Sequence, residues 1–258
     1  MEYILFTIEN QVAQIRLNRP AVFNSMNHAM RQELIAALDR CAADPGIRAV
    51  YLTGEGRAFC AGEDLQEVID PQGPSLTEII STGYNPIVMK IRELEKPVVC
   101  AVNGVAAGAG ANFALCCDFV VAARSASFIQ AFARIGLVPD CGGTWLLPRL
   151  VGRARALGLA MTGDKLPAEE AERIGLIWKC VDDAELMSTV GALAERLARM
   201  PSQALAQTRR ALDAALPMEF ADALSLEAAT QRELGRAHDF GEGVAAFLAK
   251  RAPIFRDR

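Results

Sequence analysis

The chain reads NGVAAGAGANFALCCDFVVAARSASFIQAFARIGLVPD from residue 103 to residue 140. This stretch joins a glycine-rich turn to one carboxylate, that of Asp140. The apolar runs Pro97–Val102 and Phe119–Ala122 predict strands before and after the turn, which also begins a helix. Strands that alternate with helices are typical of a mostly parallel sheet, so the stretch predicts an α/β fold.

The turn, residues 104–111, is built from glycine and alanine apart from Val105. Small residues of this kind suit a helix that packs tightly on a sheet. They also suit a site where a ligand touches the backbone, because free N–H groups at a helix start attract a developing negative oxygen. A thioester carbonyl facing such N–H groups, with Asp140 beside the next carbon, would make a site for forming and reprotonating an enolate.

Asp140 itself has two interpretations. It precedes Gly142-Gly143-Thr144, so it is placed to cap the helix that follows. The second interpretation is a catalytic acid or base. The chain holds only two histidines, His28 and His238, both in polar helical segments, and this argues against a histidine triad or a metal cluster.

The composition is that of a soluble globular protein, with 52% hydrophobic and 22% charged residues among 258. A net charge of −4 provides no basic surface of the kind that binds nucleic acid. The seven cysteines show no C-x-x-C spacing, which predicts reduced and buried thiols. There is no run of eighteen apolar residues and no leader-like N-terminal segment, so we expect a cytoplasmic protein without membrane contact.

Outward from residues 103–140, the pattern predicts one continuous fold. Short β-rich runs at Tyr3–Thr7 and Val12–Leu17 predict a hairpin, and His28–Ala43 has the apolar spacing of a helix. A strand follows at Ala49–Thr53, and the loop after it, residues 54–65, is either a second ligand loop or an ordinary connection. The last third is helical. We therefore expect a core over residues 1–200 and a helical C-terminal region over residues 201–258 within the same fold.

Three segments in this order resemble the crotonase, or enoyl-CoA hydratase/isomerase, family: Asn18-Arg19-Pro20 with Asn24, FCAGEDL at residues 59–65, and NGVAAGAG at residues 103–110. The likeness covers essentially the whole chain, since it continues through Gly142-Gly143-Thr144, LPRLVG at residues 147–152, Thr162-Gly163 and the final Phe-x-x-Lys-Arg. It implies a crotonase (ClpP-like) spiral of ββα units with a helical C-terminal trimerisation region, and trimers that pair into hexamers. It also implies an acyl-CoA thioester substrate, with coenzyme A as part of that substrate and no separate cofactor or metal.

The resemblance assigns roles to individual residues. The oxyanion hole would be formed by the backbone N–H groups of Glu63 and Ala109, with Asp140 as the catalytic carboxylate. Residues expected near the CoA thioester are Arg19, Ala61, Gly62, Asp64, Leu65, Gly108, Asn112, Phe132 and Lys250. Of these, Arg19 and Lys250 would lie near the CoA phosphates, while Asn112 and Phe132 would line a dry acyl pocket.

Two positions depart from the family hydratases, which hold a water molecule between two glutamates. Asn112 and Phe132 occupy those positions here. A phenyl ring cannot activate water, so simple hydration is disfavoured. Asp140 falls where several isomerases of the family keep an acid, and one carboxylate is enough to move a proton between two carbons of the acyl group.

The resemblance therefore implies an acyl-CoA isomerase with a single Asp acid/base and an oxyanion-stabilised thioester enolate. Within the family, the likeness is greatest to the branch of phenylacetate catabolism that opens an epoxide-bearing ring and shifts a double bond between the 3 and 2 positions of an enoyl-CoA. It rests on residues 103–111, 136–149 and 152–160. An enoyl-CoA hydratase and a non-catalytic CoA-thioester binder remain the alternatives.

Overall fold

The computed structural model describes residues 1–257 of the chain and is built around two sheets. The larger sheet has six strands in the order β1-β2-β3-β5-β7-β10. Its strands are β1 (Ile4–Glu9), β2 (Val12–Leu17), β3 (Ala49–Gly54), β5 (Val98–Val102), β7 (Phe119–Ala123) and β10 (Lys179–Val181). Only β1 and β2 pair in the antiparallel sense, as a hairpin, and the other pairs are parallel. The predicted hairpin and the mostly parallel sheet are confirmed.

The smaller sheet has four strands in the order β4-β6-β8-β9. These are β4 (Ala58–Cys60), β6 (Val105–Ala107), β8 (Ser127–Ile129) and β9 (Lys165–Pro167), of which only β9 pairs in the antiparallel sense. Each of β4, β6 and β8 follows a strand of the larger sheet and leads to a helical segment, so the expected ββα unit repeats along the chain. The residue pattern did not reveal this sheet, because runs of three residues show no periodicity.

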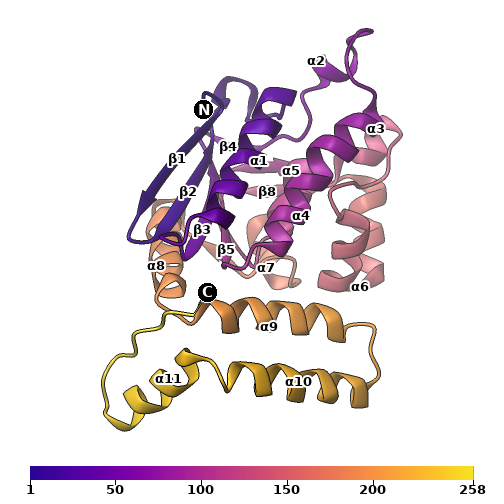
Figure 1. Ribbon diagram of the computed structural model, residues 1–258. Coiled ribbons are helices and arrows are strands. Elements are labelled where there is room, and N and C mark those ends of the chain that lie inside the picture. The colour runs from indigo at the N-terminus through magenta and orange to yellow at the C-terminus, as the bar shows by residue number, and fades with distance from the viewer. Residues whose placement is uncertain (258) are drawn as a thin grey trace.

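Helices surround the two sheets (Figure 1). The α-helices of the core are α1 (His28–Ala43), α2 (Leu65–Val68), α3 (Leu76–Glu78), α4 (Asn85–Glu93), α5 (Ala109–Leu115), α6 (Gly143–Thr162), α7 (Ala168–Arg173) and α8 (Leu186–Ala198). Shorter turns of other helix types are η1 (Pro20–Val22), η2 (Ile79–Tyr84), η3 (Ala131–Ile135) and η4 (Asp183–Glu185). Gly152 interrupts α6 with a φ of 75° and a ψ of 159°, so α6 consists of two helical pieces.

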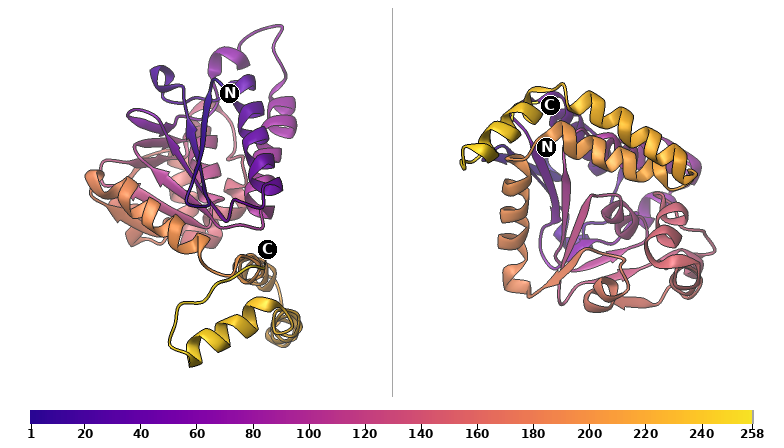
Figure 2. Two further views of the ribbon diagram at one scale, coloured as in Figure 1. Left: turned by 60° about the vertical axis from the view of Figure 1, so that its left-hand side comes forward. Right: turned by 90° about the horizontal axis from the view of Figure 1, so that it is seen from below.

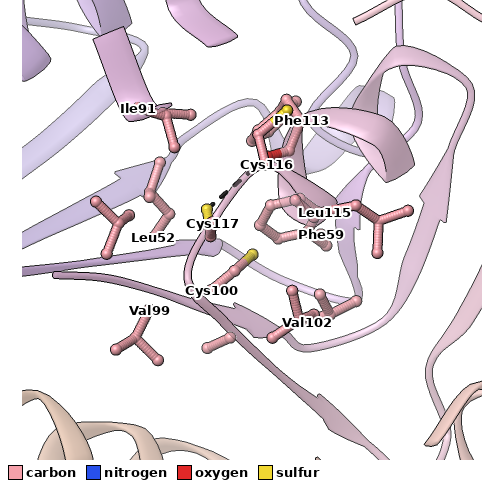
Figure 3. Close-up of a cluster of buried hydrophobic side chains, with 14 of the residues drawn as sticks. Leu52, Phe59, Ile91, Val99, Cys100, Val102, Phe113, Leu115, Cys116 and Cys117 are labelled. Atoms are coloured by element: carbon pink, nitrogen blue, oxygen red, sulfur yellow. Dashed lines mark hydrogen bonds between the residues drawn. The ribbon is translucent and has the colours of Figure 1, made fainter. Parts of the chain in front are cut away.

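The helix α5 packs into the hydrophobic core. All five residues of β5 are buried, and the rings of Phe59 and Phe113 have centroids 5.2 Å apart. Figure 3 shows these two rings together with the thiols of Cys100 and Cys117. Six of the seven cysteines are buried, and Cys180 is partly exposed. Because all seven residues of α5 are buried, this helix is a rigid support for residues at its N-terminal end.

The C-terminal helices form a layer of their own at one end of the core (Figures 1 and 2). They are α9 (Ser202–Ala215), α10 (Phe220–Leu234) and α11 (His238–Leu248). An ion pair of 3.0 Å between Arg209 of α9 and Asp118 joins this layer to the core. Within residues 1–257, no helix combines the length and the hydropathy needed to cross a membrane.

Candidate active site

Two segments far apart in the sequence meet at the N-terminal end of α5. Gly62, in the loop after β4, has a φ of 95°. A Cβ at Gly62 would lie 3.0 Å from the carbonyl oxygen of Ala107 and 3.5 Å from the nitrogen of Ala109. The two loops are therefore in direct contact, and the backbones of residues 62–63 and 109 lie next to each other.

Hydrogen bonds orient the backbone of Glu63. The N–H of Met26 donates to the carbonyl of Gly62 at 2.8 Å, and the N–H of Asp64 donates to the carbonyl of Met26 at 3.0 Å. In a parallel bridge of this kind, the residue between the two bonds points its own N–H away from the partner, here Met26. The N–H of Ala109 begins α5 and has no carbonyl one turn earlier to donate to. Within residues 1–257 neither N–H has a protein acceptor, so both are unpaired donors.

Gly108 and Gly110 have different structural roles in the glycine-rich turn: Gly110 confirms the packing interpretation, and the ligand-contact interpretation stays a prediction. Gly108 precedes α5 with a φ of 53°, a conformation that side chains disfavour. Gly110 is required by packing, because a Cβ there would lie 2.4 Å from the carbonyl oxygen of Cys60. One glycine shapes the turn that leaves the Ala109 N–H free, and the other brings α5 against β4.

Asp140 lies in a tight turn before α6. Its carbonyl accepts the N–H of Gly143 at 2.8 Å, but no side chain caps α6, so the capping interpretation of the carboxylate is wrong. Within residues 1–257, the buried Oδ1 of Asp140 has no hydrogen-bond partner. Burial raises the pKa of Asp140 above its ordinary value. The carboxylate is therefore partly desolvated, and one of its oxygens has no protein partner.

Asn112 and Phe132, the two departures from the hydratase pattern, lie around the start of α5. The ring of Phe132 is buried and lies 3.8 Å from the position that a Cβ of Gly108 would take. Asn112 is wholly buried, and both ends of its amide bind protein groups: Nδ2 donates to the carbonyl of Asp140 at 2.9 Å, and Oδ1 accepts from Gln130 at 2.7 Å. Both polar ends of Asn112 are therefore used within the protein, and the expectation that Asn112 lines the acyl pocket stays a prediction.

The side chain of Glu63 is directed to α1. Arg31 of α1, which is 1% exposed, donates to both carboxylate oxygens of Glu63 at 2.6 and 2.7 Å, and to Glu67 at 2.5 Å. Burial raises the pKa of Glu63 to about 7, although Arg31 acts in the opposite direction. The resulting ion pair holds the loop after β4, which contains the Glu63 N–H, against α1. Sequence analysis missed both Arg31 and Gln130, and a polar side chain beside an apolar helical face or strand end was the only local signal for them.

Residues 7–258 match the sequence profile of the enoyl-CoA hydratase/isomerase family. The chain belongs to this family. It is 50% identical over 258 residues to the 1,2-epoxyphenylacetyl-CoA isomerase of Escherichia coli (strain K12), covering 99% of this chain and 98% of that protein. It is also 50% identical to a Rhodobacter capsulatus protein named "Probable enoyl-CoA hydratase", with the same coverage. The crystal structure of an enoyl-CoA hydratase from Bacillus anthracis superposes with a TM-score of 0.91 at 31% identity, covering 99% of this chain and 100% of that one.

Family membership and the superposition confirm the crotonase fold. The remaining predicted site residues fall into two groups, one beside Gly62 and one, Lys250, in the C-terminal layer. Arg19 pairs with Asp64 at 2.9 Å, and Asp64 also accepts the N–H of Gln66 at the start of α2. Ala61 lies in the same loop and Leu65 begins α2, so these residues lie close in sequence to the Gly62 contact. Lys250 follows α11, and α11 lies in the C-terminal layer, away from α2 and α5 (Figure 1). Within a single chain, Lys250 is therefore distant from the ion pair of Arg19 and Asp64.

His238, Asp239 and Asp257 form the one group in the described chain whose spacing would suit a metal ion, with ligand atoms within 4.8 Å of one another. The Asp239 carboxylate, however, accepts the N–H groups of Arg256 at 2.7 Å and Asp257 at 3.1 Å. These bonds hold the C-terminal segment against α11, which gives the group a structural role.

Replacing Gly62 by alanine tests the contact between the two loops. We expect Gly62→Ala to lower the free energy of unfolding by about 1–3 kcal/mol, because alanine is strained at a positive φ and its Cβ approaches the Ala107 carbonyl. We also expect a higher KM for a CoA thioester, since the Ala109 N–H must shift. Urea unfolding and steady-state kinetics measure the two effects. Gly158→Ala, in an open part of α6 with no atom within 4 Å of the new Cβ, is the matched control and should be neutral or slightly stabilising.

Proposed function

We propose that this chain is an acyl-CoA isomerase that works through a thioester enolate. The proposed reactions are the isomerisation of 2-(1,2-epoxy-1,2-dihydrophenyl)acetyl-CoA in phenylacetate degradation, the shift of a 3-enoyl-CoA to a 2-enoyl-CoA, or both. One observation carries the proposal. Asp140 presents a desolvated carboxylate with an unpartnered oxygen, while the two glutamate positions of a hydratase hold Asn112 and Phe132. The 50% identity to an epoxyphenylacetyl-CoA isomerase supports the same reaction class.

The proposed mechanism uses two backbone donors and one base. The thioester oxygen accepts hydrogen bonds from the N–H groups of Glu63 and Ala109, which stabilise the enolate oxygen by roughly 3 kcal/mol per donor. Asp140 removes a proton from the α carbon, so the C–H electron pair moves into the enolate. In the double-bond shift, Asp140 then returns that proton to the γ carbon, which leaves the new double bond between the α and β carbons. The proton is conserved, and neither water nor a cofactor is consumed.

Isotope exchange provides the direct test of the proposal. Incubation with a 3-enoyl-CoA in deuterated water should yield the 2-enoyl-CoA and place deuterium at the α or γ carbon, because the proton on Asp140 can exchange between the two transfers. Mass spectrometry and NMR of the acyl group measure both results. Binding of the thioester without isomerisation or exchange would contradict the proposal and favour a CoA-thioester binder.

Hydration is the second candidate, because one relative at 50% identity is named as a hydratase. A hydratase converts a 2-enoyl-CoA to a 3-hydroxyacyl-CoA, which has one more water molecule and is separable by chromatography. Phe132 and Asn112 offer no second carboxylate for that water. We therefore expect the isomerised product to predominate over the hydroxyacyl product.

The assembly and its surroundings are part of the same proposal. We propose a homotrimer or a dimer of trimers in the cytoplasm, with no cofactor beyond the CoA of the substrate and no nucleic-acid or membrane partner. The C-terminal layer supports an oligomer, because Phe220, Phe247 and Leu248 are 77%, 83% and 75% exposed in the single chain. The assignment of Lys250 to a CoA phosphate depends on this oligomer, since a neighbouring copy must supply the site. Light scattering coupled to size-exclusion chromatography tests it.

A further inference from the structure

Two side-chain hydrogen bonds connect the end of β8, the helix α5 and the turn that contains Asp140. Gln130, at the end of β8, donates from Nε2 to Oδ1 of Asn112 at 2.7 Å. Asn112, on α5, donates from Nδ2 to the backbone carbonyl of Asp140 at 2.9 Å. Both side chains are buried, Asn112 at 0% and Gln130 at 4% exposure. A β-strand end, a helix and the turn of the proposed base are thus joined by two hydrogen bonds out of contact with water.

The turn that receives this hydrogen bond is strained. Cys141 and Gly142, which follow Asp140, have φ values of 48° and 78°. A non-glycine residue in this region costs about 1–3 kcal/mol unless its surroundings hold it there. The first turn of α6 donates backbone N–H groups to the carbonyls of Asp140 and Gly142. Among the described residues, the side-chain hydrogen bonds to residues 138–142 come from Asn112 and from the Cys116 thiol, which lies 3.5 Å from the Cys141 carbonyl. A thiol is a weak donor, so Asn112 provides the main side-chain restraint on the turn.

Asn112 reaches the turn because Gly143 makes room for it. A Cβ on Gly143 would lie 2.2 Å from Nδ2 of Asn112, closer than any real contact. Gly143 also donates its N–H to the same Asp140 carbonyl at 2.8 Å. The carbonyl therefore accepts one hydrogen bond from its own turn and one from α5, and these two bonds fix the peptide plane next to the catalytic side chain.

The same helix carries the proposed oxyanion donor. Asn112 lies three residues after Ala109 in α5, and its N–H donates to the Gly108 carbonyl at 3.2 Å. A helix held against the core moves as one body, so a bond from Asn112 to Asp140 sets the distance between donor and base. Misplacement by about 1 Å lowers the rate of an enzymatic step by about 10²-fold.

We propose that Asn112, oriented by Gln130, is a positioning residue that holds Asp140 in register with the Ala109 N–H. The proposal rests on the proposed function, because it assigns a role relative to that reaction. Asn112 acts through Asp140, since both ends of its amide bind protein groups.

The test compares two variants of this network in the full-length protein. Asn112→Asp keeps the size of the side chain and an acceptor for Gln130, but it loses the N–H donor and sets a carboxylate against the Asp140 carbonyl. We expect kcat for 3-enoyl-CoA isomerisation to fall about 10- to 100-fold with KM within about twofold of wild type. Gln130→Met leaves Asn112 in place without its orienting partner, so a smaller loss of kcat is expected.

Two further measurements separate positioning from general loss of stability. Asn112→Asp adds a carboxylate next to the Asp140 turn, and a like charge raises the pKa of a carboxyl group, so the acid limb of the kcat/KM profile should move to higher pH. Amide hydrogen exchange at Gly143 should accelerate. Arg48→Met is the control, because Arg48 is buried and binds the carbonyls of Ala198 and Met200. It should lower stability without moving kcat or the acid limb.

The outcomes distinguish this proposal from the proposed function. If wild-type protein turns over and a folded Asn112→Asp variant matches it in kcat and acid limb, the positioning role is wrong. If Arg48→Met reproduces the kinetic changes at equal loss of stability, the role is again wrong, because any destabilisation would suffice. If wild-type protein shows no isomerisation or exchange, the proposed function fails first, and the positioning role fails with it.

Discussion

Asp140→Asn is expected to lower kcat for isomerisation by at least about 10²–10⁴-fold, the usual contribution of a positioned acid or base. Asparagine has the same shape as aspartate but cannot accept the α proton. The fold should survive. Burial raises the pKa of Asp140, so the native state holds the proton more tightly than the unfolded chain does. Above both pKa values the ionised carboxylate therefore costs stability, and the neutral amide removes that cost.

Three measurements check this result. Steady-state kinetics with a 3-enoyl-CoA gives the loss of kcat, isothermal titration with a substrate analogue gives the binding affinity, and thermal unfolding gives the stability. The affinity should be unchanged, and Tm at neutral pH should be equal to or above that of wild type. Asp164→Asn, which changes an exposed carboxylate paired with Arg134 at 3.5 Å, is the control and should leave all three unchanged. Turnover like that of wild type in Asp140→Asn would remove Asp140 from the mechanism.

Sequence analysis predicted the fold to the extent that the fold is built from long periodic segments. The β1–β2 hairpin, α1 and the parallel strands β3, β5 and β7 each carry enough residues to show their period. The smaller sheet does not, because each of its strands has three residues and is defined by pairing with segments distant in sequence. Its existence followed from the family resemblance, which implies repeated ββα units.

The candidate site, like the fold, contains some residues that the sequence alone reveals and others that it does not. The proposed donors at Glu63 and Ala109 belong to local motifs, so their segments could be recognised from the sequence. Arg31 and Gln130 could not, since their importance arises only when α1 meets the Glu63 loop and β8 meets α5. Asn112 shows the limit most clearly. A position that is a catalytic glutamate in family hydratases is here an amide whose polar atoms are used inside the protein, and only its two partners reveal that change.

Arg31→Met is expected to cost about 3–5 kcal/mol of unfolding free energy at pH 8, because it leaves the Glu63 and Glu67 carboxylates without their counter-charge in a largely buried position. The loss should depend on pH. The pKa of Glu63 is already raised by burial to about 7, and removing Arg31 raises it further. The native variant then binds a proton more tightly than the unfolded chain, so its stability falls as pH rises from about 5 to 8. Urea unfolding at several pH values measures this slope.

The double variant Arg31→Met/Glu63→Gln separates the charge effect from the loss of packing. If the cost of Arg31→Met comes from an unpaired carboxylate, the second change should recover much of the stability at pH 8 and little at pH 5, where Glu63 in the single variant is protonated. Arg40→Met, on the exposed face of α1 over the ring of Phe6, is the matched control and should cost less than about 1 kcal/mol at either pH. A pH-independent loss in the single variant, unrelieved by Glu63→Gln, would mean that Arg31 supports the loop by packing. The Glu63 N–H would then owe its orientation to the Met26 bridge alone.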